Sequence, residues 1–308
     1  MSVHDGESTR VDYLGAALII AAAIAFSAKA IFVKLAYADV TSNVRVDPVT
    51  LLTMRMGLSL PLFAVIAWWS SRQTSHAMTR RDWVALTGIG LIGYYAASLF
   101  DFWGLMFISA ALERLILFLN PTIVVVISAL ALGYRITARD VFALVISYAG
   151  IALVFAADLN ANRDGVLLGS ALVLISAILY AVYLVGAGQM IKRIGAVRFA
   201  SYASIVSCVA ISLHFLIMRD VDLLAGQSPR VWGLAGAMAL FSTVLPIMMM
   251  AEGMRRIGSS NAAMMSSIGP MSTILLGYVF LGEPMTATQM VGAGLVLTGV
   301  LVISLKKN

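Results

Sequence analysis

Ten long apolar segments dominate this chain of 308 residues. A helix needs about 20 mostly apolar residues to cross the hydrocarbon core of a membrane, and each segment is close to that length or longer. The segments lie at residues 12–37, 48–69, 83–106, 109–132, 139–157, 165–188, 196–218, 230–252, 259–281 and 287–305. The connections between them are short, so none of them can hold a soluble domain. The pattern predicts an all-α polytopic membrane protein with ten transmembrane helices.

The composition excludes a soluble enzyme. Hydrophobic residues make up 61% of the chain and charged residues 12%, whereas soluble domains contain about 45–50% and about 25% of these classes. A chain of this kind cannot cover a water-facing surface with polar groups. The single cysteine, Cys208, excludes an intrachain disulfide and a zinc site built from thiolates. The sequence shows no Ser/His/Asp or histidine-rich constellation, so we expect no metal, no cofactor and no catalytic residue.

Basic residues are unevenly divided between the two sides of the predicted membrane. With the N-terminus in the cytoplasm, the cytoplasmic segments contain thirteen of them: Arg10, Arg72, Arg80, Arg81, Arg135, Arg139, Lys192, Arg193, Arg198, Arg255, Arg256, Lys306 and Lys307. The outer segments contain four: Arg45, Arg163, Arg219 and Arg230. This bias predicts a multi-pass protein of the bacterial inner membrane with both termini in the cytoplasm. It also accounts for the net charge of +6, so we expect no nucleic-acid partner.

The second half of the chain repeats the first at an offset of 149 residues. The identical pairs are Gly104/Gly253, Ile108/Ile257, Pro121/Pro270, Leu132/Leu281, Gly133/Gly282, Thr137/Thr286, Ala138/Ala287 and Gly150/Gly299. Leu14-Gly15 matches Leu168-Gly169 at an offset of 154, and the longer first connection accounts for the difference. We therefore expect two five-helix units, 1–158 and 159–308, within one membrane domain. Because five is odd, the second unit would enter the membrane inverted, which is an architecture of transporters.

Short motifs recur in the same order in both halves. The first half contains Phe107-Ile-Ser-Ala-Ala, Leu119-Asn-Pro and Leu132-Gly, and the second contains Arg256-Ile-Gly-Ser-Ser, Ile268-Gly-Pro and Leu281-Gly-Glu-Pro. The chain thereby resembles two tandem EamA-like domains of the drug/metabolite transporter superfamily over nearly its whole length. The resemblance implies ten helices, a central cavity between the halves and movement of small metabolites, often export. Two features depart from the family pattern: Tyr134 stands where the second half has Glu283, and the Glu113-Arg114 pair occupies a place usually filled by small residues.

Prolines inside the predicted helices point to a cavity. They are Pro61, Pro121, Pro246 and Pro270. An internal proline removes one backbone hydrogen bond and kinks its helix, and in lipid the freed carbonyl needs a partner or a cavity. Pro121 and Pro270 are related by the repeat and lie near the middle of the membrane. We expect both to kink their helices beside a central cavity, with simple curvature of a packed helix as the alternative.

Away from the span ends, six Asp, Glu, Lys or Arg residues lie inside the predicted spans, all in the first half: Lys29, Lys34, Arg55, Asp101, Glu113 and Arg114. A charge at the bilayer centre costs at least about 2.5–3.5 kcal/mol on insertion scales, so it usually faces the protein interior. We expect Lys29 and Arg55 to bind an anionic part of a substrate. Asp101 and Glu113 are candidate proton carriers, or they form charge pairs with the cations, for example with Arg55 or Arg114. Lys29 has no acid within reach on its own helix, so it needs an acid from another helix, water or an anionic part of the substrate. The alternatives are snorkelling to the outer interface for Lys34 and Arg114, and a structural clamp onto helix-end carbonyls for Arg55.

Three uncharged residues complete the predicted substrate site. Asn120 lies seven residues after Glu113, and Tyr94 lies seven residues before Asp101, so each shares a helix face with an acid. Tyr94 and Tyr183 would provide aromatic walls for an organic substrate. The alternative for both tyrosines is helix packing or interfacial anchoring.

These features favour a secondary active transporter that moves a small organic metabolite across the inner membrane by alternating access, with export as the expected direction. The sequence has no nucleotide-binding motif in a suitable context, so an ion or substrate gradient would drive the movement. A passive channel or pore for small solutes is the alternative, and an intramembrane enzyme ranks behind both. The expected partners are the lipid bilayer and the small-molecule substrate, with the chain as a monomer or a homodimer.

Overall fold

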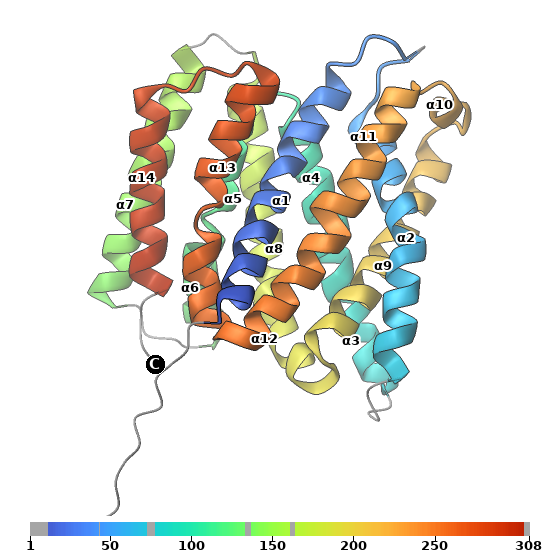
Figure 1. Ribbon diagram of the computed structural model, residues 1–308, viewed down its shortest axis with the longest axis horizontal. Coiled ribbons are helices and arrows are strands. Elements are labelled where there is room, and N and C mark those ends of the chain that lie inside the picture. The colour runs from blue at the N-terminus through green and yellow to red at the C-terminus, as the bar shows by residue number, and fades with distance from the viewer. Residues whose placement is uncertain (1–11, 43, 73–77, 133–136, 161–163, 305–308) are drawn as a thin grey trace, which may run out of the picture.

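The computed structural model describes residues 12–42, 44–72, 78–132, 137–160 and 164–304. All regular structure in these residues is helical, and no strand occurs among them. The beginning of α1 (Tyr13–Tyr37) and the end of α14 (Ala287–Ser304) lie at the same edge of the bundle (Figure 1). The chain is an all-helical, polytopic membrane protein.

Eight helical stretches of the described chain are long and apolar enough to cross a membrane: Tyr13–Tyr37, Pro48–Arg72, Arg80–Gly104, Ala110–Ile127, Ala138–Leu159, Val166–Gly188, Ala196–Met218 and Pro229–Ile257. Two further apolar helices, Gly269–Leu281 and Ala287–Val302, are shorter. Ala287–Val302 lies in the predicted tenth span, whereas Gly269–Leu281 covers only the later part of the predicted ninth span, 259–281. The first residues of that span belong to a helix that continues to Ser266, so the predicted boundary between the eighth and ninth spans is wrong. The long apolar segments of the sequence therefore correspond to apolar helices throughout the described chain.

Several of these stretches contain more than one element. In chain order, the α-helices and π-helical segments (η) are α1 (Tyr13–Tyr37), α2 (Pro48–Arg72), α3 (Arg80–Gly90), η1 (Leu91–Ala96), α4 (Ala97–Gly104), α5 (Ala110–Leu117), α6 (Asn120–Leu132), α7 (Ala138–Asn160), α8 (Val166–Ile194), α9 (Ala196–Met218), α10 (Asp222–Ala225), α11 (Pro229–Ala239), η2 (Leu240–Val244), α12 (Leu245–Ser266), α13 (Gly269–Leu276), η3 (Gly277–Leu281) and α14 (Ala287–Ser304).

Two kinds of helix interruption recur at the offset of 149 residues. The π-helical segments η1 and η2 begin at Leu91 and Leu240. The break between α5 and α6 comes directly before Asn120-Pro121, and the break between α12 and α13 comes directly before Gly269-Pro270. π-helical turns occur frequently at functional sites, because they displace backbone groups from the regular ladder. The weak sequence repeat thus coincides with a repeat of backbone irregularities.

The repeated Thr-Ala dipeptide begins a helix in both halves. Asp140 Oδ2 accepts hydrogen bonds from the backbone N–H of Thr137 at 2.8 Å and from its hydroxyl at 2.7 Å. Gln289 Oε1 accepts one from the backbone N–H of Thr286 at 3.1 Å, and the backbone N–H of Gln289 donates to Thr286 Oγ1 at 3.2 Å. Both arrangements are capping boxes, which satisfy the free N–H groups at a helix start.

Glycines allow helix backbones of the two halves to approach closely. A Cβ atom on Gly253 would lie 3.1 Å from the carbonyl oxygen of Gly15, where α1 packs along α12. A Cβ atom on Gly104 would lie 2.8 Å from the carbonyl oxygen of Gly169, where α4 packs along α8. Membrane helices associate through such small residues, because van der Waals contact rather than the hydrophobic effect holds helices together in lipid.

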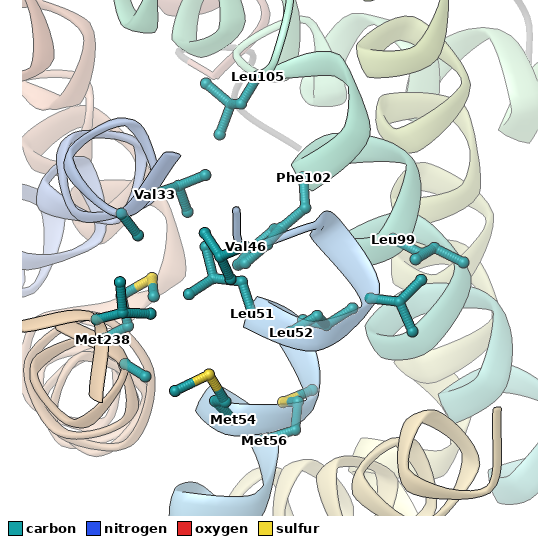
Figure 2. Packing of buried hydrophobic residues seen from close by; sticks show 14 of the residues in the cluster. Val33, Val46, Leu51, Leu52, Met54, Met56, Leu99, Phe102, Leu105 and Met238 are labelled. Carbon is teal, nitrogen blue, oxygen red and sulfur yellow. The ribbon is translucent and has the colours of Figure 1, made fainter. Parts of the chain in front are cut away.

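A large apolar cluster joins α1, α2, α4 and α11 (Figure 2). Its buried members include Val33 of α1, Leu51 of α2, Phe102 of α4 and Met238 of α11. Close packing of this kind leaves little freedom for the helices to rotate. The cluster therefore fixes the relative orientation of the three helices that carry Lys29, Arg55 and Asp101.

Candidate functional site

A cavity of about 390 Å³ is lined by elements from both halves of the chain. The first half contributes α1, α2, η1, α4, α5 and α6, and the second contributes α8, η2 and α12. Most of the residues predicted for the site border this cavity: Lys29, Arg55, Tyr94, Asp101, Arg114, Asn120 and Pro121. The structure thus brings together residues from helices that are far apart in the sequence.

Lys29 contacts both acids of the cluster. Its Nζ lies 2.5 Å from Asp101 Oδ2 and 2.8 Å from Glu113 Oε1. The lysine side chain is 15% exposed, and those of Asp101 and Glu113 are 5% and 1% exposed. Taking ions out of water carries a large desolvation penalty, which only close pairing offsets. Lys29 therefore holds α1, α4 and α5 together, and Glu113 lies behind it rather than on the cavity wall.

Among the alternatives that the sequence leaves open, the acids thus pair with Lys29 and not with Arg55 or Arg114. Asp101 Oδ1 and Glu113 Oε2 are buried and have no hydrogen-bond partner among the described residues. A proton that binds one of these free carboxylate oxygens would change the net charge of the cluster of Lys29, Asp101 and Glu113 by one unit. That is the chemical requirement of a proton carrier, and the role remains a prediction.

Arg55 lies at the side of the cavity formed by α2 and η2. Its Nε donates a hydrogen bond of 2.9 Å to Thr243 Oγ1, and its guanidinium carbon stands 5.5 Å from the centre of the Phe102 ring. The residue is 8% exposed. Cation–π contact and one hydrogen bond to a hydroxyl orient the guanidinium group without neutralising its charge. Arg55 is thus held in place by both halves of the chain.

Arg114 lies beside the break between α12 and α13. Its Nε is buried, and the side chain forms no hydrogen bond or ion pair within the described residues. A Cβ atom on Gly269 would lie 2.7 Å from Arg114 Nη2. The guanidinium group therefore fits into space that the glycine leaves open, in the cavity wall rather than at the membrane interface.

The predicted tyrosines form part of an aromatic cluster. Tyr183 Oη donates a hydrogen bond of 3.2 Å to Tyr94 Oη, and the rings of Tyr180 and Tyr183 stack with centroids 5.3 Å apart. Tyr94 and Tyr180 border the cavity, whereas Tyr183 lies behind them and stacks on Phe199. A contact of Tyr183 with substrate is therefore indirect in this conformation, through the position of Tyr94.

Asn120 and the two prolines mark the helix breaks. Asn120 Nδ2 donates a 2.6 Å hydrogen bond to the carbonyl of Leu117, while its Oδ1 is buried without a partner in the described chain. Pro121 borders the cavity. Pro270 is buried within the first turn of α13, where a missing N–H costs no helical hydrogen bond. The two prolines thus begin helices instead of bending continuous ones.

Sequence reasoning missed the hydroxyl groups of the cavity wall. Ser98, Ser176, Ser242 and Thr243 border the cavity. Serine and threonine are common in apolar spans, so their side chains carry little signal by themselves. The repeat offset was the available signal, because Thr243 lies 149 residues after Tyr94, which the sequence analysis places in the site.

Comparison with known proteins assigns the chain to a family. The model of the EamA-like transporter family matches it twice, over residues 13–156 and 167–305. The chain belongs to this family, in agreement with the resemblance seen in the sequence.

Relatives and a solved structure extend this result. An uncharacterized transporter of Bacillus subtilis, YcbK, is 28% identical over 305 residues, covering 97% of this chain and 96% of that protein. An uncharacterized transporter of Archaeoglobus fulgidus is 24% identical over 274 residues, covering 89% and 95%. A crystal structure with 18% identity superposes with a TM-score of 0.63 over 93% of this chain and 99% of that one. The last similarity concerns the fold alone; the relatives support transport as the general function.

Proposed function

We propose that this chain is a secondary active transporter that moves a small organic metabolite across the inner membrane by alternating access, with export as its direction. The observation that carries the proposal is the cavity of about 390 Å³, to which both halves contribute walls. Charged and hydroxyl side chains line this cavity together with aromatic and apolar ones. A few placed polar groups in a mostly apolar cavity are typical of small-molecule sites.

The helix contacts support a ten-span architecture of two inverted five-span units. The packing of α1 on α12 has a counterpart in that of α8 on α4 and η1, and the packing of α2 on α11 has one in that of α9 on α3. The packing of α1 on α13 likewise corresponds to that of α8 on α6. A two-fold axis that relates the two units would exchange each of these helix contacts with its equivalent. With five spans in each unit, this axis lies in the membrane plane.

This symmetry gives a reason for alternating access. If the two units can adopt each other's conformations, the molecule has two equivalent states that open the cavity to opposite sides. The π-helical segments η1 and η2 and the two helix breaks lie at the cavity wall, where a small change in backbone dihedrals would move whole helix ends. The basic bias of the loops orients the edge that holds the start of α1 and the end of α14 toward the cytoplasm.

The proposal is tested by flux measurements in proteoliposomes. A thermal-shift screen of the purified protein against a metabolite library first identifies compounds that bind. Uptake of a labelled binder should then saturate with concentration and accelerate when unlabelled compound is placed inside the vesicles. Flux that rises linearly and ignores compound on the opposite side would identify a passive pore and reject the proposal.

A further inference from the structure

Arg114 lines the cavity and forms no hydrogen bond or ion pair with an acid among the described residues. Both acids of the site contact Lys29, at 2.5 and 2.8 Å. Arg114 has no hydrogen bond or ion pair with any residue that the structure describes, and its Nε is buried. A guanidinium group has five N–H donors, and a buried donor without a partner is costly. The buried Nε of Arg114 therefore lacks a hydrogen-bond acceptor among the described residues, and the Nη donors are not bound to any of them either.

The charges around the cavity leave a positive excess. Lys29, Arg55 and Arg114 carry three positive charges, against the two negative charges that Asp101 and Glu113 carry when ionised. Arg55 is bound through Nε to the neutral hydroxyl of Thr243, so this contact does not cancel its charge. An uncompensated charge within a membrane is expensive. A single anion in the cavity would restore neutrality.

We propose that the transported metabolite is an organic anion whose acidic group binds the guanidinium of Arg114; this inference rests on the transport function proposed above. Arginine matches a carboxylate with two parallel hydrogen bonds. The organic part lies along Phe26, Phe118, Tyr94 and Tyr180, which border the same cavity. A volume of about 390 Å³ is near the lower end of the range for ligand sites, about 300–1,000 Å³, so the anion is small.

Two further residues define the site. Asn120 Oδ1 is a buried acceptor without a partner in the described residues, so a hydroxyl or amino group on the metabolite fits beside the acid. Gly269 is a positioning residue, because a Cβ atom there would lie 2.7 Å from Arg114 Nη2. The cation that recognises the anion is thus Arg114, while Lys29 neutralises the acids.

The experiment compares matched carboxylates and amides on the purified full-length protein. The probes are acetate, lactate, benzoate and phenylacetate, each beside its amide at equal ionic strength, and the readout is the concentration dependence of Tm. At least one carboxylate should raise Tm, with its amide at least tenfold weaker. Arg114→Gln should weaken that binding at least tenfold, and Arg114→Lys less, because it keeps the charge. Arg255→Gln, at an exposed arginine paired with Glu252, is the matched control and should bind as the unchanged protein does.

The outcomes separate this inference from the transport function. Equal binding of acid and amide, full binding by Arg114→Gln, or no stabilisation by any of the carboxylates would overturn the inference. Saturable, trans-stimulated flux of a neutral or cationic metabolite would also overturn it, but would leave transport standing. Gly269→Ala provides a second test that keeps the charge: it should weaken carboxylate binding while Tm without ligand still reports a cooperative transition.

Discussion

The two halves of the chain share their backbone irregularities but not their charges. In the second half, Tyr183 occupies the position equivalent to Lys29, at the offset of 154 residues, and Met250 that equivalent to Asp101, at 149. Lys29 forms ion pairs with two acids, whereas Tyr183 stacks on Phe199 and donates one hydroxyl hydrogen bond. The repeat therefore preserves the helix geometry, whereas the charged side chains that line the cavity all come from the first half.

The largest effect should follow from removing the lysine. Lys29→Met leaves two carboxylates buried without their cation, and breaking a buried pair typically costs about 3–5 kcal/mol. We expect a severe loss of folded protein, measured as the monodisperse fraction after purification and as Tm. At the equivalent position of the other half, Tyr183→Phe removes only one hydroxyl hydrogen bond, at a cost of about 0.5–1.5 kcal/mol. Equal losses from both variants would contradict the comparison.

Neutralising the whole cluster should recover part of that loss. In the triple variant Lys29→Met, Asp101→Asn, Glu113→Gln neither acid is left as a buried anion without its lysine, and replacing a buried ion pair by neutral groups is often close to neutral in stability. Folded yield should therefore rise well above that of Lys29→Met alone. If it stays as low, the acids do not depend on Lys29 for neutralisation.

The close helix contacts at Gly104 and Gly253 should be equally sensitive to an added methyl group. An alanine at Gly104 or at Gly253 places a methyl group against a carbonyl oxygen of the facing helix, and overpacking costs about 1–3 kcal/mol. We expect similar decreases in Tm for the two variants, because the contacts are equivalent. Gly57→Ala is the matched control, since a Cβ atom there meets nothing within 4 Å. A loss confined to one half would break the proposed two-fold relation.

The smallest effect on stability should come from Arg114, which forms no ion pair among the residues that the structure describes. Arg114→Met removes a charge that contributes no ion pair within the described residues, so the Tm of the empty protein should stay constant or rise slightly. Functional sites often carry such a cost in stability. A fall in Tm as large as that of Lys29→Met would show that Arg114 is structural.

The sequence predicts the helices and most residues of the cavity wall, because the signals involved are local. Twenty apolar residues require a span wherever they occur, and a charge such as Arg55 is excluded from lipid regardless of its partners. Which charged residues pair with one another is not determined by the local sequence. Whether Lys29 or Arg114 reaches Glu113 depends on how three helices are rotated about their axes, and the π-helical turn of η1 changes that rotation within a span. The hydroxyls of η2 escaped prediction because serine and threonine are common in apolar spans and carry little signal by themselves.

Alternating access of the central cavity is tested most directly by labelling one cysteine from each side of the membrane. Cys208→Ser removes the single native thiol and keeps a donor to the carbonyl of Met56. Ser98→Cys then places a thiol on the cavity wall, and Val65→Cys, at a position of α2 that is 64% exposed, is the lipid-facing control.

A membrane-impermeant thiosulfonate should label the cysteine at 98 both in right-side-out and in inverted vesicles, and should leave the cysteine at 65 unlabelled. A bound metabolite should slow the labelling from both sides. Labelling from one side only, in every condition, would contradict the account, because the cavity would then be a pocket that never opens across the membrane.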